Sequence, residues 1–376
     1  MSDSNVVRIL VVVKAMVAGG LETYLVNVLS AIDRQKYKVT IVCTAERENW
    51  YKDELDKLGV KTITCPNPYS QIGYVHRIGK IIRELDIDVV CDFRSDFSAP
   101  TLLAAKRAGV KKRIAMYRNT GRGFRPDPLR NLYVNIMHRC TKLWATRIIG
   151  NTGKVLDAFY PGWKDNDKFA VVYNGVDLNK FSPDVSGQSI RQELVVSSDC
   201  IIIGHVGRFY IQKNHIILLK SFARLKQEVE NIHLLLVGDG ELRRDIEKQI
   251  KQLGIAEYVT LAGVRKDVPK MLAAMDIFFF PSLYEGMPNA LIEAMACGLP
   301  IVASNIPEIV EIITTELSEQ LIDPNDVTGF VEALRKLVTD KTSRKKMGFV
   351  GRTHVERHFE LSVSAEKLCS YWAAEL

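Results

Sequence analysis

The chain has 376 residues, 47% of them hydrophobic and 25% charged, which is the composition of an ordinary globular protein long enough for two domains. Its seven cysteines stand singly, without a C-x-x-C pair, which argues against a zinc ribbon and favours a reducing compartment. Charged residues interrupt every apolar run before it reaches membrane-spanning length, and we see no targeting segment, so we expect a cytoplasmic protein.

The formal net charge of +7 is concentrated in one segment. Between residues 106 and 130 a single acid, Asp127, stands against Lys106, Arg107, Lys111, Lys112, Arg113, Arg118, Arg122, Arg125 and Arg130. Such a cluster fits a polyanion, or the inner face of a membrane that carries anionic lipid. The alternative is an ordinary solvated surface, and because no nucleic-acid-binding motif accompanies the cluster, we expect no nucleic-acid partner.

The chain opens with an apolar run, Val6 to Val13, that is typical of a strand buried on both faces of a parallel sheet. Gly19 and Gly20 follow, and residues 21–32 have apolar side chains at helical spacing. A glycine turn at a helix start lets a ligand approach the backbone and favours an anion. Two glycines are a weak signal, and the G-x-G-x-x-G fingerprint is absent, so we predict no nicotinamide site.

The rest of the first half repeats this alternation. We predict strands at Val39–Cys43, Lys61–Thr64, Val89–Phe93, Arg113–Met116, Arg147–Gly150 and Phe169–Tyr173, with helices at His76–Leu85 and Ser98–Ala108 between some of them. Alternation of this kind predicts a mostly parallel sheet covered on both sides. A further helix, Leu129–Trp144, mixes apolar and basic residues, and either packs on its own sheet or lies on a lipid surface with the basic cluster.

The pattern weakens near residue 180 and then restarts, which places a domain boundary there. In the second half we predict strands at Cys200–Val206, His233–Val237, Val259–Leu261, Ile277–Phe280 and Pro300–Ala303, and helices at Ile216–Leu225, Glu241–Leu253 and Asn289–Ala296. The sequence therefore predicts the α/β class, as two doubly wound, Rossmann-like domains that face each other across a cleft. Ligands of such sheets bind beyond the carboxyl ends of the strands.

The stretch from Glu285 to Glu293 joins a predicted strand to a predicted helix at that edge. A helix start presents N–H groups and partial positive charge to a phosphate, and here the backbone N–H groups of Met287, Asn289 and Ala290 are the expected donors. Carboxylates accept hydrogen bonds from the neighbouring hydroxyls of a sugar. For an isolated pair of glutamates the ordinary alternative, a helix-dipole residue and a solvated charge, would be preferred.

Two basic residues favour a binding site over this alternative: Arg208 and Lys213 follow the first strand of the second half by a few positions. A guanidinium and an ammonium in one crevice suit a diphosphate and stabilise negative charge on it as it leaves. Glu293 is then placed to bind ribose hydroxyls, and the loop at Val264 and Arg265 lies where a base would rest. Glu285 would reach the sugar.

These motifs resemble the retaining family 4 glycosyltransferases, which have the two-domain GT-B fold. The resemblance covers nearly the whole chain, and its blocks are Gly19-Gly20-Leu-Glu22, Tyr173-Asn-Gly-Val-Asp177, Gly207-Arg208 with Lys213, Val237-Gly-Asp-Gly240, Pro281-Ser-Leu-Tyr-Glu285 and Glu293-Ala-Met-Ala-Cys-Gly-Leu-Pro-Ile-Val-Ala303. The last block is the most specific. By this resemblance the first domain, residues 1–180, binds the acceptor, residues 181–358 bind the nucleotide sugar, and a last helix within 359–376 packs back on the first domain.

The resemblance also implies roles for single residues. Arg208 and Lys213 would bind the donor's phosphates, Glu293 the ribose and Glu285 the transferred sugar, while Gly20, next to Gly19, would approach the distal phosphate. Arg208, Lys213 and Glu285 are thus the expected catalytic residues. Such enzymes keep the anomeric configuration, need no metal or other cofactor, and are thought to pass the acceptor's proton to the leaving phosphate.

One departure from the family concerns the first domain. Many relatives carry histidines at the ends of its fourth and fifth strands, where they touch the donor sugar. Here these segments read Cys91-Asp-Phe-Arg94 and Ala115-Met-Tyr-Arg118-Asn119. We therefore take Arg94, Arg118 and Asn119 as acceptor-side candidates, which would favour a charged or differently substituted donor or acceptor.

The sequence leads us to expect a glycosyltransferase that moves a hexose-type sugar from a nucleotide diphosphate donor, with uridine as the expected base. The expected acceptor is a polysaccharide or a lipid-linked glycan of the cell surface. Two rivals remain: a catalytically silent GT-B subunit that stabilises an active transferase, and a sugar-nucleotide epimerase. Slow hydrolysis of the donor argues against the first, and a converted free sugar without acceptor would indicate the second.

Overall fold

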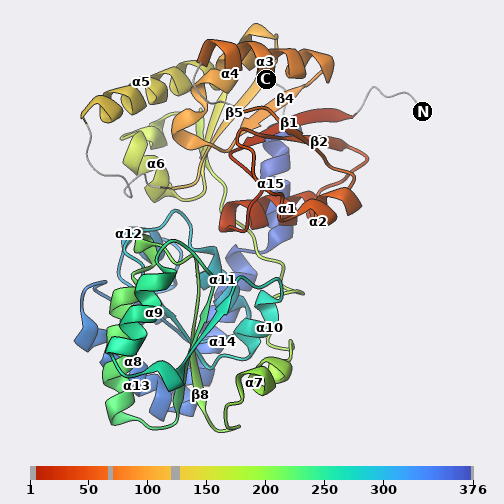
Figure 1. Cartoon of the computed structure of the whole chain (residues 1–376). Helices are drawn as coiled ribbons and strands as arrows, with labels where there is room; N and C mark the ends of the chain where they lie inside the picture. The colour runs from red at the N-terminus through yellow and green to blue at the C-terminus, as the bar shows by residue number, and fades with distance from the viewer. Residues whose placement is uncertain (1–5, 67–70, 120–127, 374–376) are drawn as a thin grey trace. The chain divides into compact units, whose positions relative to one another are not determined.

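The computed structural model describes residues 6–66, 71–119 and 128–373. The chain divides into two compact units (Figure 1), Met1–Gly175 with Leu361–Leu376 and Val176–Glu360. Each unit has its own parallel sheet, which confirms the predicted α/β class. Within the described ranges, no helix has both the length and the apolar character needed to cross a bilayer.

The sheet of the first unit has seven parallel strands in the order β3-β2-β1-β4-β5-β6-β7. Their bounds are β1 Val7–Val13, β2 Tyr37–Cys43, β3 Lys61–Thr64, β4 Val89–Asp92, β5 Lys112–Tyr117, β6 Arg147–Gly150 and β7 Phe169–Val171. The chain crosses from the β1 side to the β4 side of the sheet, so the order reverses between β1 and β4. In such sheets the reversal is where ligands bind, at the carboxyl ends of the strands.

Helices cover both faces of this sheet (Figure 1). They are α1 Gly20–Ala31, α2 Lys52–Lys57, α3 Gln71–Glu84, α4 Ala99–Arg107, α5 Pro128–Trp144, α6 Gly153–Phe159 and α15 Leu361–Ala373, with 3-10 turns η2 Ser95–Phe97 and η3 Trp163–Asp165. Successive side chains of a strand point to opposite faces. Ile9 and Val11 accordingly pack in the cluster of α1 and α15, and Leu10 and Val12 in the cluster of α3 and α4. This explains why the whole β1 segment is apolar.

The last helix, α15, belongs to the first unit although it follows the second in sequence. Its Trp372 is fully buried and meets the Tyr37 ring edge-on, with centroids 5.7 Å apart. Lys112 Nζ donates to the Trp372 carbonyl oxygen at 2.7 Å, and Ser364 Oγ donates to the Tyr173 carbonyl oxygen at 2.6 Å. The expectation of a last helix that returns to the first unit is confirmed.

The sheet of the second unit has six parallel strands in the order β10-β9-β8-β11-β12-β13. The strands are β8 Ile201–Val206, β9 Ile232–Val237, β10 Val259–Gly263, β11 Ile277–Phe280, β12 Ile301–Ser304 and β13 Leu321–Ile322. The first five agree with the predicted strands to within two residues. The sixth was not predicted, because two residues are too few for a period to show in the sequence.

The helices of the second unit also lie on both faces of its sheet. They are α7 Gln188–Leu194, α8 His215–Glu228, α9 Arg243–Gln252, α10 Val268–Ala273, α11 Asn289–Ala296, α12 Pro307–Val310, α13 Val327–Thr339 and α14 Lys341–His358, with 3-10 turns η4 Ile211–Lys213, η5 Ala256–Tyr258 and η6 Thr315–Gln320. Phe279 of β11 packs in one core with Phe222 of α8 and Phe330 of α13. Phe278 and Phe280 point to the other face, toward His205.

Candidate active site

The loop after β8 begins the site of the second unit. Glycine is required twice here, because a Cβ on Gly207 would lie 2.7 Å from His205 Nε2, and one on Gly238 would lie 2.0 Å from the Gly207 carbonyl oxygen. Gly238 also has a φ of +140°, a backbone conformation that residues with a Cβ rarely adopt. The two loops that follow β8 and β9 therefore lie against each other. Arg208 stands exposed at this sheet edge, directly after Gly207.

Lys213 and Glu285 form a buried ion pair at the same edge. Lys213 Nζ lies 2.7 Å from Glu285 Oε1, and the two side chains are 14% and 6% exposed. The ammonium also lies over the Phe280 ring, 4.4 Å from its centroid. Of the predicted catalytic residues, the structure thus brings Lys213 and Glu285 into direct contact. A buried pair of this kind needs further hydrogen bonds to offset its lost hydration.

Gln212 supplies one of those bonds and was missed in the sequence. Its Nε2 donates to Glu285 Oε2 at 3.0 Å and to the Tyr284 carbonyl oxygen at 2.9 Å. Both oxygens of Glu285 therefore have a donor, and the carboxylate is held in one orientation. Its position next to Lys213 is the only sequence feature that could have indicated this role. It was not enough, because a lone glutamine in a loop is ordinarily solvated.

Two buried histidines lie beneath Lys213. His205 Nδ1 is 2.9 Å from the Phe279 carbonyl oxygen, and the His205 ring meets the His215 ring edge-on at 5.2 Å. Burial and the nearby Lys213 lower the pKa of His215 to about 4, and burial lowers the pKa of His205 well below its usual value. Both rings are therefore neutral at neutral pH, and Lys213 carries the positive charge of this group.

Glu293 lies in α11, and its carboxyl group has an unusual pKa. The side chain keeps some contact with solvent, yet desolvation by the surrounding protein raises its pKa to about 7, against the opposing effect of Lys180. The sequence had not pointed to Lys180, because it lies more than a hundred residues away. A carboxyl group that is only partly ionised at neutral pH is well suited to exchange hydrogen bonds with hydroxyls.

The start of α11 follows the prediction in its bounds. Asn289 is its first residue and Pro288 its cap position, and the Asn289 N–H donates to the Met287 carbonyl oxygen at 3.0 Å. Met287 is buried, whereas Asn289 and Ala290 are partly exposed. The positive end of the helix thus lies between Glu285 and Glu293 in the chain.

In the loop predicted to bind the base, the Arg265 side chain is already engaged within the protein. Arg265 is held by two carboxylates, with its Nε 2.8 Å from Asp267 Oδ1 and its Nη1 2.7 Å from Glu193 Oε1. These bonds raise its pKa above the usual value. Val264 is 45% exposed. The loop therefore offers a ligand the Val264 side chain and backbone more readily than the Arg265 guanidinium.

In the first unit, α1 starts at Gly20 with Gly19 as its cap residue. The φ of Gly19 is −177°, an extended conformation open to any residue, so backbone strain does not explain the glycine. Thr23 Oγ1 donates to the Gly19 carbonyl oxygen at 2.8 Å and lies 2.7 Å from the Tyr51 hydroxyl. Thr23 thus occupies the first turn of α1 and fixes the cap.

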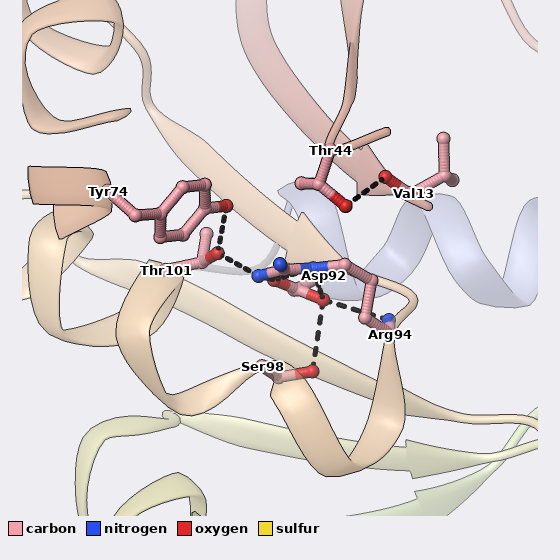
Figure 2. Close-up of polar contacts among 7 residues, drawn as sticks. All are labelled: Val13, Thr44, Tyr74, Asp92, Arg94, Ser98 and Thr101. Carbon is pink, nitrogen blue, oxygen red and sulfur yellow. Dashed lines mark hydrogen bonds and ion pairs between the residues drawn. The ribbon is translucent and has the colours of Figure 1, made fainter. Parts of the chain in front are cut away.

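Arg94, one of the acceptor-side candidates, is buried in a closed polar cluster (Figure 2). Its Nη2 lies 2.7 Å from Asp92 Oδ2, and it also donates to Thr101 Oγ1, which is 2.8 Å from the Tyr74 hydroxyl. Ser98 Oγ donates to Asp92 Oδ1 at 3.0 Å. Burial lowers the pKa of Arg94, but the Asp92 carboxylate outweighs this effect and raises it overall. These contacts give Arg94 a structural role.

Arg118 ends up in a different environment one strand away. Its guanidinium lies 4.2 Å from the centroid of the Tyr24 ring and 5.6 Å from that of Phe93, and its Nη2 donates to Asn174 Oδ1. The residue is 8% exposed, and desolvation lowers its pKa. Asn119, the third candidate, is exposed at the end of the strand.

Comparison with known proteins identifies the family of the chain. Glycosyltransferase Family 4 matches residues 18–180, and Glycosyl transferases group 1 matches residues 187–354. EpsF of Bacillus subtilis (strain 168), which carries the name glycosyltransferase, is 32% identical over 317 residues, or 81% of this chain and 80% of EpsF. The UDP-Gal:alpha-D-GlcNAc-diphosphoundecaprenol alpha-1,3-galactosyltransferase of Escherichia coli is 29% identical over 272 residues, 70% of this chain and 69% of the relative.

The fold has solved counterparts as well. The crystal structure of Anabaena HepE in complex with UDP and glucose matches with a TM-score of 0.84 at 19% identity, over 97% of this chain and 98% of HepE. Two parallel α/β sheets with a last helix returned to the first define a glycosyltransferase of the GT-B fold. The chain belongs to glycosyltransferase family 4, as the motif resemblance predicted, and it is a sugar-transferring enzyme.

Proposed function

We propose that this enzyme transfers a hexose from a UDP-linked donor to a lipid-linked glycan or polysaccharide acceptor, with retention of the anomeric configuration and without a metal ion. The observation that carries the proposal is the buried Lys213–Glu285 pair at the carboxyl edge of the second sheet, where Arg208 is exposed after Gly207. This edge is where doubly wound sheets bind ligands. The Escherichia coli relative takes UDP-Gal and a diphosphoundecaprenol acceptor, and HepE binds UDP, which supports both halves of the proposal.

In this mechanism the cations neutralise the donor's diphosphate. An ammonium has three donors, so Lys213 can keep its bond to Glu285 and still donate to a phosphate oxygen. Arg208, exposed at the same edge, adds a second charge-assisted bond. Both bonds strengthen as charge develops on the leaving diphosphate, which is the condition for acceleration of the chemical step.

The carboxylates bind the two sugars on either side of the diphosphate. Glu285, fixed by Lys213 and Gln212, accepts hydrogen bonds from the hydroxyls of the transferred hexose. Ionised Glu293 accepts hydrogen bonds from the ribose hydroxyls, and the Ala290 amide in the first turn of α11 faces the phosphate, since the Asn289 N–H already donates to the Met287 carbonyl oxygen. The backbone at Val264 contacts the base. The departing phosphate then takes the proton of the acceptor hydroxyl.

For the acceptor side we propose contact with an anionic membrane surface through α5. Its exposed face carries Leu132, Tyr133, Ile136 and Leu143 at 37 to 69% exposure, together with the exposed cations Arg139 and Lys142. Apolar side chains next to basic ones are typical of helices that lie on lipid. Arg122 and Arg125 of the predicted basic cluster lie outside the described residues.

The proposal is tested by donor binding and slow donor hydrolysis. UDP-hexoses should raise the melting temperature of the protein and release free hexose during long incubation, and both effects should shrink in Lys213→Ala. The matched control is Lys220→Ala, an exposed lysine on α8. Binding without any hydrolysis or transfer would favour the silent subunit instead, and conversion of the sugar nucleotide without acceptor would favour an epimerase.

A further inference from the structure

Among the residues that the structure describes, Arg118 is a buried cation that forms no close ion pair with a carboxylate. Its Nη1 is shielded from solvent and finds no hydrogen-bond partner there. The nearby Cys91 cannot supply the charge, because burial raises the pKa of its thiol and keeps it neutral. The Glu22 carboxylate favours the charged form of Arg118, but its effect is smaller than those of Tyr24 and Cys91.

Burial of a guanidinium in this way is costly. An ionised group that leaves water without an anion loses several kcal/mol of hydration, and aromatic stacking with one amide acceptor returns only part of it. Buried charges without a partner occur at functional sites, where a bound ligand can supply the opposite charge. The position fits a ligand, because Arg118 follows the last residue of β5 at the carboxyl edge of the sheet, against the first turns of α1.

We propose that Arg118 is a specificity-determining residue that binds an oxyanion of the acceptor substrate. The unpartnered Nη1 donates to this oxyanion, while Nη2 keeps its hydrogen bond to Asn174 Oδ1 and the guanidinium stays on the Tyr24 ring. The positive end of α1 favours the same charge. A carboxylate on an acidic sugar and a phosphate of a lipid carrier both have this chemistry. The inference rests on the proposed function only in that an acceptor binds at this edge.

The test compares the wild type with Arg118→Gln, and with Lys111→Gln as the control. Lys111 is exposed just before the amino end of β5, so its loss removes one positive charge from the same unit at the other edge of the sheet. Binding of D-glucuronate against D-glucose, and of glycerol 1-phosphate against glycerol, is measured by saturation-transfer NMR at constant ionic strength.

We expect the wild type and Lys111→Gln to bind one of the anionic probes at least about tenfold more tightly than its neutral counterpart, as a charge-assisted hydrogen bond allows. Arg118→Gln should lose this preference. A preference for glucuronate assigns the oxyanion to a sugar, and one for glycerol phosphate assigns it to a lipid carrier. An absence of preference in the wild type, or a preference retained in Arg118→Gln, overturns the proposal.

A second variant separates recognition from a structural role. Arg118→Met removes the buried charge and keeps the stem of the side chain, so its melting temperature without ligand should equal or exceed that of the wild type. A melting temperature several degrees lower would assign Arg118 to the fold and overturn the proposal. UDP binding by the same variants should be unchanged, and failure of the wild type to bind any UDP-hexose would reject the proposed donor without bearing on Arg118.

Discussion

Arg94 and Arg118 follow neighbouring strands, and both are buried. The sequence predicts both equally as residues on the acceptor side. The fold gives them opposite surroundings. Arg94 meets Asp92, whose carboxylate is fully buried, and the cluster is closed by Thr101 and Ser98 (Figure 2). Arg118 meets two aromatic rings and one amide oxygen. The difference teaches that the role of a buried arginine depends on its counter-ion. An arginine paired with a carboxylate stabilises the fold, whereas we propose that one without such a partner binds a ligand.

The largest effect should come from breaking the closed pair. Arg94→Met leaves the Asp92 carboxylate buried with its cation removed, so the free energy of unfolding should fall by about 3 to 5 kcal/mol. Urea denaturation measures it, with Arg118→Met as the matched control. Equal stability of the two variants would erase the distinction between the two arginines.

The second unit offers the same contrast between Lys213, paired with Glu285, and the exposed Arg208. Each alanine variant should weaken donor binding by about 1.5 to 3 kcal/mol, because a charge-assisted bond to phosphate is lost. Lys213→Ala should also lower stability, since Glu285 is left buried, whereas Arg208→Ala should not. Calorimetry with UDP-hexose and thermal melts separate the two effects; unchanged donor affinity in both variants would discard the diphosphate site.

Glu293 extends the comparison to a carboxyl group whose desolvation the nearby Lys180 offsets only in part. Its pKa rises from 4.5 to about 7 on folding, so the folded state holds a proton that the unfolded state loses, and stability declines as pH rises through this window. Glu293→Gln should therefore be more stable than the wild type at pH 8 by about 3 kcal/mol and nearly equal to it at pH 4.5. Urea titrations at the two pH values decide the matter; a constant difference between them would contradict the raised pKa.

The smallest effect concerns the exposed charges of α5. Arg139→Gln should weaken binding to vesicles rich in anionic lipid by about 1 kcal/mol, roughly fivefold, as expected for one basic residue near a charged surface. Lys248→Gln, exposed on α9 of the second unit, is the control. Vesicle sedimentation in low salt measures both, and equal pelleting of the two variants would remove α5 from the membrane contact.

Much of this arrangement could be predicted from the sequence, for reasons that differ between elements. Strands such as β1 and β11 were predicted to within a residue, because strands buried on both faces are apolar without interruption. Helix α7 was not predicted, since its surroundings are polar; Gly187 before it packs so closely on α10 that a Cβ would lie 2.3 Å from the Ala274 nitrogen. Gln212 and Lys180 were not predicted as site residues, because their partners Glu285 and Glu293 are far away in the sequence.

The sequence by itself determined the class of fold and the type of groups at the sheet edges, because periodicity and glycine-rich turns are local properties of the chain. Only the tertiary structure decided what each charge does. Asp92 stands two residues before Arg94, yet which arginine it pairs with, which glutamate meets Lys213, and which carboxyl group loses its hydration depend on side chains that converge from separate strands. Electrostatic energies depend on distance and burial, and neither is written in the order of the residues.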